Sequence, residues 1–105
     1  MTTFAKQPNE VLDYDVDMTA WFAGIPSDNI QSVEITVTSF AETTPALTLG
    51  PEPHPAYVLI GANPARFKVW LGGGTEYVDY VVTCVVSTEQ DRVKEVEFTV
   101  KVRNR

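Results

Sequence analysis

The strongest constraint on this chain is a two-residue alternation of apolar and polar side chains in its last strand-like segment. From Val96 to Val102 every second side chain is apolar, and the residues between them are charged or threonine. Because successive side chains of a β-strand point to opposite faces, this period predicts a strand with one buried face. The same alternation recurs at residues 11–18, 32–40 and 66–71, so most of the chain is predicted to fold as β-sheet.

Short apolar runs between these segments complete the predicted strand pattern. Proline- and glycine-rich breakers separate the runs, and no segment favours a helix longer than one turn. Short strands with regular turn signals are typical of a β-sandwich. The predicted fold class is therefore all-β, an immunoglobulin-like β-sandwich of about seven antiparallel strands, with a small open barrel as the alternative. The predicted strands are residues 11–18, 32–40, 46–49, 57–60, 66–71, 76–87 and 94–102.

The length of 105 residues leaves room for one hydrophobic core. We therefore expect residues 11–105 to form a single immunoglobulin-like domain. Residues 1–10 do not follow the alternation and are expected to be an N-terminal arm or an edge segment. The glycine run at residues 72–74 is expected to form a turn that requires positive φ.

The charge balance of the chain is acidic, with a net charge of −6. An acidic surface repels phosphate, so no nucleic-acid partner is expected. No apolar run approaches the roughly 20 residues of a membrane-spanning helix, so no membrane partner is expected either. The first residues lack the apolar stretch of a secretory signal, and Cys84 is the only cysteine. Both features indicate folding in a reducing cytosol.

The residue types used in catalysis and metal binding form no recognisable constellation. Asp13, Asp15 and Asp17 resemble the start of a calcium loop, but the positions that need glycine and glutamate hold Met18 and Gly24. One histidine and one cysteine cannot supply the three or four ligands of a zinc site. We therefore predict that the chain is not an enzyme and has no catalytic residues, no cofactor and no metal.

The segment 76–87 has apolar residues on both faces. A strand of a two-layer sandwich needs only one apolar face, so its second face is expected to be covered by a loop of this chain or by another protein. Aromatic residues are enriched at protein interfaces, although Trp21 and Trp70 could instead complete the core. The candidate partner-binding residues are Phe4, Lys6, Trp21, Phe22, Tyr57, Trp70 and Tyr77.

Three segments resemble a family of tailed-phage virion proteins of the fiber-tail adaptor type. They are residues 4–18, followed closely by Trp21, then Val69–Tyr77 with its Trp-Leu-Gly-Gly-Gly sequence, and the final Phe98–Val102. The resemblance covers nearly the whole chain. It implies an immunoglobulin-like virion component that is assembled in the bacterial cytoplasm and repeated by symmetry. It also implies self-association and partners among other virion proteins, and it brings no catalytic residues.

Three functions are compatible with this resemblance or with the aromatic residues. The first is a non-enzymatic structural protein that docks other virion proteins as a tail or tail-fibre adaptor. The second is a capsid decoration protein, since the resemblance does not fix the position in the particle. The third is a carbohydrate-binding module for host attachment, in which Trp21, Tyr57, Trp70 and Tyr77 would stack on sugar rings.

Overall fold

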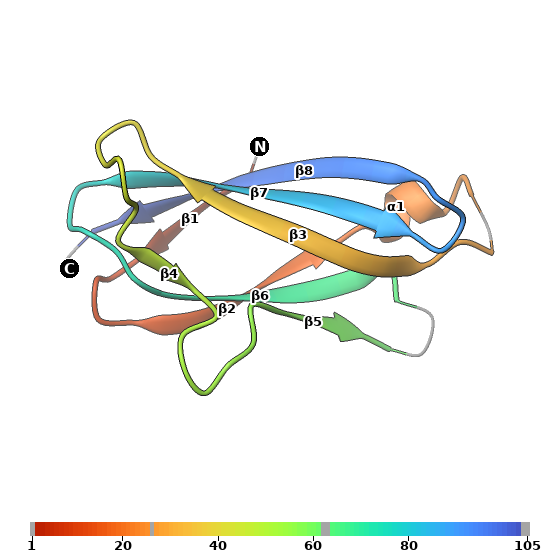
Figure 1. Cartoon of the computed structure of the whole chain (residues 1–105), viewed down its shortest axis with the longest axis horizontal. Helices are drawn as coiled ribbons and strands as arrows, with labels where there is room; N and C mark the ends of the chain where they lie inside the picture. Colours follow the sequence, from red (N-terminus) through yellow and green to blue (C-terminus); the bar gives the residue numbers. More distant parts are fainter. Residues whose placement is uncertain (1, 26, 62–63, 104–105) are drawn as a thin grey trace.

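The computed structural model describes residues 2–25, 27–61 and 64–103, and Figure 1 shows two β-sheets packed face to face. One sheet has the strand order β1-β8-β7-β3, and the other has the order β2-β6-β4, with β5 also paired to β6. The sheets do not close into a barrel, so the predicted β-sandwich is confirmed. The elements are β1 (Thr2–Lys6), β2 (Val11–Asp17), α1 (Thr19–Phe22), β3 (Ile30–Thr38), β4 (Leu47–Leu49), β5 (Tyr57–Ile60), β6 (Arg66–Gly73), β7 (Asp79–Thr88) and β8 (Val93–Val102).

The strand β1 corrects the expectation of about seven antiparallel strands, because it is an eighth strand and pairs in parallel with β8. The pairing begins with Thr2 opposite Phe98 and runs along the whole of β1. The reason is packing: the Phe4 ring packs against two core rings, with centroid distances of 4.9 Å to Tyr14 and 5.5 Å to Phe98. The start of the chain is therefore an edge strand of the first sheet.

Lys6 ends β1 as a buried residue, with 2% of its surface exposed. Its ammonium group donates hydrogen bonds to the backbone carbonyls of Gln7 at 2.8 Å and Gly73 at 2.6 Å. Burial lowers the pKa of Lys6, against a smaller opposing effect of the Glu10 carboxylate. The bond to Gly73 ties the first sheet to the end of β6 in the second sheet.

The central strand of the second sheet, β6, is longer than the predicted segment 66–71. Gly72 and Gly73 continue it and pair with β4, so the expected glycine turn starts later than predicted. A side chain at Gly72 would place its Cβ 3.0 Å from the ring of Pro51, which explains why glycine fits there. The positive φ angles expected for the run occur at Gly73 (70°) and Gly74 (102°).

The strand β7 begins at Asp79, three residues later than the predicted start at residue 76. Tyr77 has a φ of 70°, which interrupts the extended backbone, and its N–H donates to the carbonyl of Val102 at 2.7 Å. The N–H of Val78 donates to the carbonyl of Thr75 at 3.1 Å. Residues 76–78 before β7 are thus part of a turn, and the prediction that they belong to the strand was wrong.

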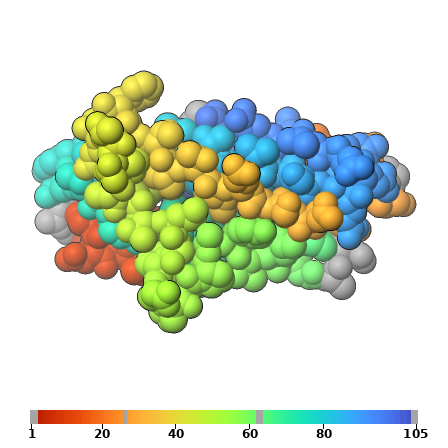
Figure 2. All heavy atoms as spheres, in the orientation of Figure 1, coloured from red at the N-terminus to blue at the C-terminus, as the bar shows by residue number. Residues whose placement is uncertain are grey.

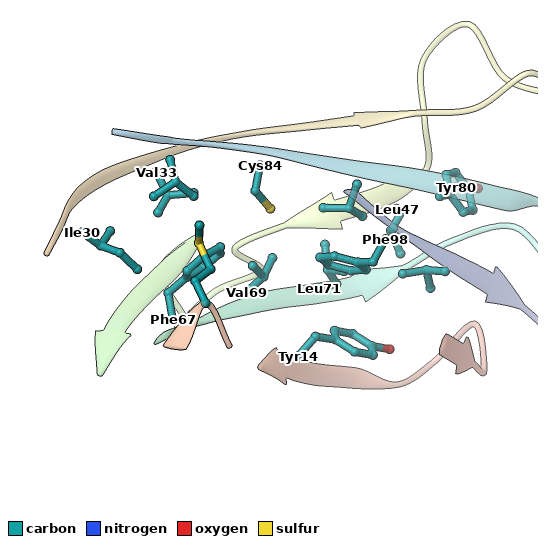
Figure 3. Packing of buried hydrophobic residues seen from close by; sticks show 14 of the residues in the cluster. Tyr14, Ile30, Val33, Leu47, Phe67, Val69, Leu71, Tyr80, Cys84 and Phe98 are labelled. Carbon is teal, nitrogen blue, oxygen red and sulfur yellow. The ribbon is translucent and has the colours of Figure 1, made fainter. Parts of the chain in front are cut away.

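The core lies between the inner faces of the two sheets, where side chains from facing strands interdigitate (Figure 3). Nearly every inward position predicted from the alternation is buried or half-buried there. The side chains with no exposed surface are Phe67, Val69, Leu71, Tyr80, Val82, Cys84, Val86, Val100 and Val102.

The helix α1 is a single turn that follows β2. The carboxylate of Asp17 accepts a hydrogen bond from the N–H of Thr19 at 2.9 Å, which holds the start of the turn. Phe22 is buried and packs edge-to-face on Trp21, with a centroid distance of 4.8 Å. Within the described residues, no helix is long and apolar enough to cross a membrane.

Candidate protein-docking surface

The outer face of the first sheet contains the apolar side chains of β7 that point away from the core. Val81 and Val85 are half-buried on this face. The strand register places Thr38 of β3 and Thr99 of β8 on either side of Val81. Neighbouring side chains therefore cover this second apolar face in part, and part of it remains open to solvent.

A hollow of about 300 Å³ lies at one end of this face, and we call it the Phe40 surface. Phe40 is fully exposed, at 107% of its reference accessibility, so its ring contributes nothing to the core. Figure 2 shows the segment after β3, in yellow, standing out from this end of the molecule. The surface is defined by Thr38, Ser39, Phe40, Asp79, Val81 and Thr99.

Glu42 fastens the segment that carries Phe40 to the body of the sandwich. Its carboxylate accepts hydrogen bonds from the hydroxyl groups of Thr75 and Tyr80 and from the N–H of Ala46. The Tyr80 hydroxyl oxygen in turn accepts a hydrogen bond from the N–H of Thr75 at 2.9 Å. Because Tyr80 is fully buried, this network anchors the exposed segment to the core.

The network predicts a pH dependence of the segment that it holds. Hydrogen bonds from Thr75, Tyr80 and Ala46 lower the pKa of Glu42 below its ordinary value of 4.5, against a smaller effect of burial. A carboxyl group with a lowered folded-state pKa stabilises the folded arrangement above its ordinary pKa, and this stabilisation is lost as the pH falls through the lowered value. We therefore expect the segment to stay anchored above pH 4.5 and to loosen below it.

An NMR titration of the Thr75 and Ala46 amide signals measures this loosening. Both signals should shift together with an apparent pKa below 4.5 in the unaltered protein. In the Glu42→Gln variant, which keeps the shape but removes the ionisable group, this transition should be absent. The same transition in the variant would contradict the assignment to Glu42.

Tyr77 and Arg103 extend the Phe40 surface beyond Asp79. The guanidinium group of Arg103 donates a hydrogen bond to the Asp79 carboxylate at 2.8 Å. The same group lies over the Tyr77 ring, 5.9 Å from its centroid. Tyr77 itself is 75% exposed. Asp79 lines the hollow together with Phe40 and also binds Arg103, which lies over Tyr77. Asp79 and Arg103 therefore link the exposed rings of Phe40 and Tyr77.

The seven candidate partner-binding residues are not brought together in the structure. Tyr77 is the one that lies beside the Phe40 surface. Lys6 and Phe22 are buried. Phe4, Trp21 and Tyr57 are half-buried against the core, so these five side chains stabilise the fold. Trp70 is half-buried on the outer face of the second sheet.

Trp70 is stacked on His54, the single histidine of the chain. The two rings are 3.6 Å apart at an angle of 3°, so they lie almost parallel. Sugar-binding aromatic residues present a free ring face to the ligand, but the imidazole already covers one face of Trp70. The stack therefore explains the position of both residues without a ligand.

The aspartates of β2 lie on the outer face of the second sheet, and two of them, Asp13 and Asp15, form ion pairs. The ammonium group of Lys68 is 2.9 Å from the Asp13 carboxylate and 3.3 Å from that of Asp15. Within the described residues, no three histidine, cysteine, aspartate or glutamate side chains gather in a way that could hold a metal ion. Burial raises the pKa of the Cys84 thiol to about 12, which keeps it protonated and poorly nucleophilic.

Sequence reasoning missed Phe40 and Glu42. A signal for Phe40 was present: with Val33, Ile35 and Val37 on the inner face of a strand, position 40 falls on the outer face, where a phenylalanine is unexpected. Glu42 carried no such signal, because the two partners that tie it to the sandwich, Thr75 and Tyr80, lie more than thirty residues away in the chain.

The fold and the surface together define a β-sandwich protein with an exposed aromatic surface. A family model described as podophage GP4 fiber-tail adaptor protein gp77 matches residues 6–101, and the chain belongs to this family. It is therefore a phage fiber-tail adaptor, a structural component of the virion. No curated protein matches the sequence.

Proposed function

We propose that the protein is a non-enzymatic adaptor that docks another virion protein through the Phe40 surface. The observation that carries this proposal is the complete exposure of Phe40 beside an apolar hollow on the outer sheet face. Family membership supports the adaptor role. The hydrogen bonds of Glu42 support the choice of surface, because they anchor a segment whose phenylalanine side chain adds nothing to the core and is fully exposed.

An exposed phenylalanine side chain stabilises a complex when a partner protein buries it. Burying a phenylalanine side chain contributes roughly 1.5–3 kcal/mol. Side chains that dominate binding are typically large anchors at the centre of an interface, flanked by residues that exclude water. Phe40 supplies such an anchor, Tyr77 a second aromatic contact, and the hollow accepts a side chain from the partner.

We further propose that copies self-associate in a symmetric assembly built in the host bacterial cytoplasm. The fully buried Cys84 thiol is consistent with folding in a reducing compartment. The covered face of Trp70 offers no support for the carbohydrate-binding alternative. Among the virion positions considered, family membership favours the fibre-tail junction over the capsid surface.

Photo-crosslinking at position 40 tests the proposal. Phe40 is replaced by p-benzoylphenylalanine, which keeps an aromatic side chain, and the protein is irradiated in assembled phage particles. We expect crosslinks to a tail or fibre protein. A matched probe at Val58, an exposed residue on the opposite sheet, should give fewer crosslinks to that partner. Crosslinks to the major capsid protein would support a decoration protein instead, and equal crosslinking from both positions would contradict the assigned surface.

A further inference from the structure

The strand β8 is paired along only part of one of its edges. Its edge toward β7 is paired from Val93 to Lys101. Its other edge pairs with β1 only from Phe98 to Val102. Among the residues that the structure describes, no strand pairs with the outer edge of β8 from Val93 to Glu97.

The alternation of hydrogen bonds shows which backbone groups face this open edge. The N–H of Val102 donates toward β7, to the carbonyl of Val78, and the N–H of Arg103 donates to the carbonyl of Lys6 at the end of β1. In a strand these directions alternate from residue to residue. The N–H groups of Glu95 and Glu97 therefore point away from β7, toward the open edge.

A hollow of about 290 Å³ lies beside this edge, between β8 and β2 of the other sheet. Apolar side chains from β1, β2 and β8 line its inner part, and carboxylates lie around it. An unpaired edge gives main-chain hydrogen bonds to an added strand, and an adjacent pocket accepts one of its side chains. The lining residues are Phe4, Asp15, Val16, Asp17, Val96, Glu97 and Phe98.

The charge around the edge indicates which segment fits. Four carboxylates, those of Asp15, Asp17, Glu95 and Glu97, lie on this stretch of β8 and on the adjoining end of β2. The basic residues beside them include Lys94 of β8 and Arg66 of β6, which lies opposite Asp17 in the strand register and interacts with its carboxylate. Lys68 neutralises part of the charge of Asp15, at 3.3 Å. The remaining negative charge favours lysine or arginine on an added strand.

We propose that this edge of β8 binds an extended, basic segment of another protein, which adds a strand in line with β1 and places an apolar side chain in the hollow. A second copy of this chain is a poor occupant, because its edge strands offer no exposed lysine or arginine. The strands β2 and β3 carry acidic residues, β4 and β5 are uncharged, and Lys6, the one basic residue of β1, is buried. The site lies apart from the Phe40 surface and does not depend on it, since the two hollows share no residue.

An eight-residue peptide that alternates lysine with valine is the probe for this site. Fluorescence anisotropy measures its binding to the full chain, and amide hydrogen exchange locates it. We expect slower exchange of the Glu95 and Glu97 amides and binding that weakens with added salt. A peptide with glutamate in place of lysine should bind at least tenfold more weakly.

The variant Glu95→Pro removes a donor at the open edge while leaving the hydrogen bonds to β7 in place, because edge positions tolerate proline. We expect it to weaken binding at least tenfold. If this variant fails to fold, the double variant Glu95→Lys/Glu97→Lys tests the charge, with Glu34→Lys on the opposite edge strand β3 as the matched control. The proposal is overturned by no detectable binding, by equal affinity for the altered and unaltered edge, or by protection of β2 or β3 instead.

Discussion

Phage that carry Phe40→Asp in this protein should assemble particles that lack attached fibres, and their plating efficiency should fall at least 100-fold. The substitution removes roughly 1.5–3 kcal/mol of apolar burial at the docking surface. It also places a carboxylate where the partner would have to desolvate it without a counter-charge, which adds a further cost. Since each 1.4 kcal/mol weakens binding tenfold, the lost apolar burial alone weakens binding roughly 10- to 100-fold, and the cost of desolvating the carboxylate adds to this.

The fold should not change in this variant, because the Phe40 ring is completely exposed and supports no core residue. Thermal unfolding of the purified variant should therefore match that of the unaltered protein. The control is Val58→Asp, which places the same charge at an exposed position of the other sheet. Normal fibre attachment in Phe40→Asp phage, or equal loss in both variants, would contradict the proposed docking surface.

Phe67→Ala should destabilise the protein by about 3–5 kcal/mol, the usual cost of removing a buried phenylalanine side chain. Phe67 has no exposed surface and lies on β6, the central strand of the second sheet. Its removal leaves a cavity where both sheets meet, and the surrounding β-structure can relax into it only in part. For a domain of this size, the loss is a large fraction of a typical total stability of 5–15 kcal/mol.

Urea denaturation gives the free energy of unfolding for this comparison. Phe40→Ala is the matched control, because it makes the same chemical change at a position that buries nothing. Phe40→Ala should have a free energy of unfolding within about 0.5 kcal/mol of that of the unaltered protein. The two variants should therefore differ by nearly the whole destabilisation expected for Phe67→Ala. Similar losses in both variants would mean that Phe40 contributes to the core after all.

The alternation of side chains predicted most of the fold because each buried strand face leaves a local trace in the sequence. The inward residues of β7 and β8 were identified in this way. The limits of the method appear at Tyr77, where a residue typical of strands occupies a turn with positive φ. The turn depends on its contact with Val102, which is distant in the chain, and a local pattern does not contain that information.

The parallel strand β1 and the docking surface were harder to predict for the same reason. Lys6 is a charged residue, yet it is buried, because the carbonyl group of Gly73, which is distant in the chain, accepts a hydrogen bond from its ammonium group. Phe40 looked like the last residue of a strand, but β3 ends at Thr38. Glu42 gains its importance only when folding brings the turn before β7 next to it.

The pairing of β1 with β8 determines how the protein responds to mechanical load. The two strands lie side by side and run in the same direction, with five register pairs between them. A force that pulls residue 2 away from residue 103 acts along these strands in opposite senses, so it loads their hydrogen bonds in shear and stretches them together. An antiparallel terminal pair would instead open one bond at a time. The terminal strands of this member of the fiber-tail adaptor family are thus paired in the geometry that resists a pull on residues 2 and 103.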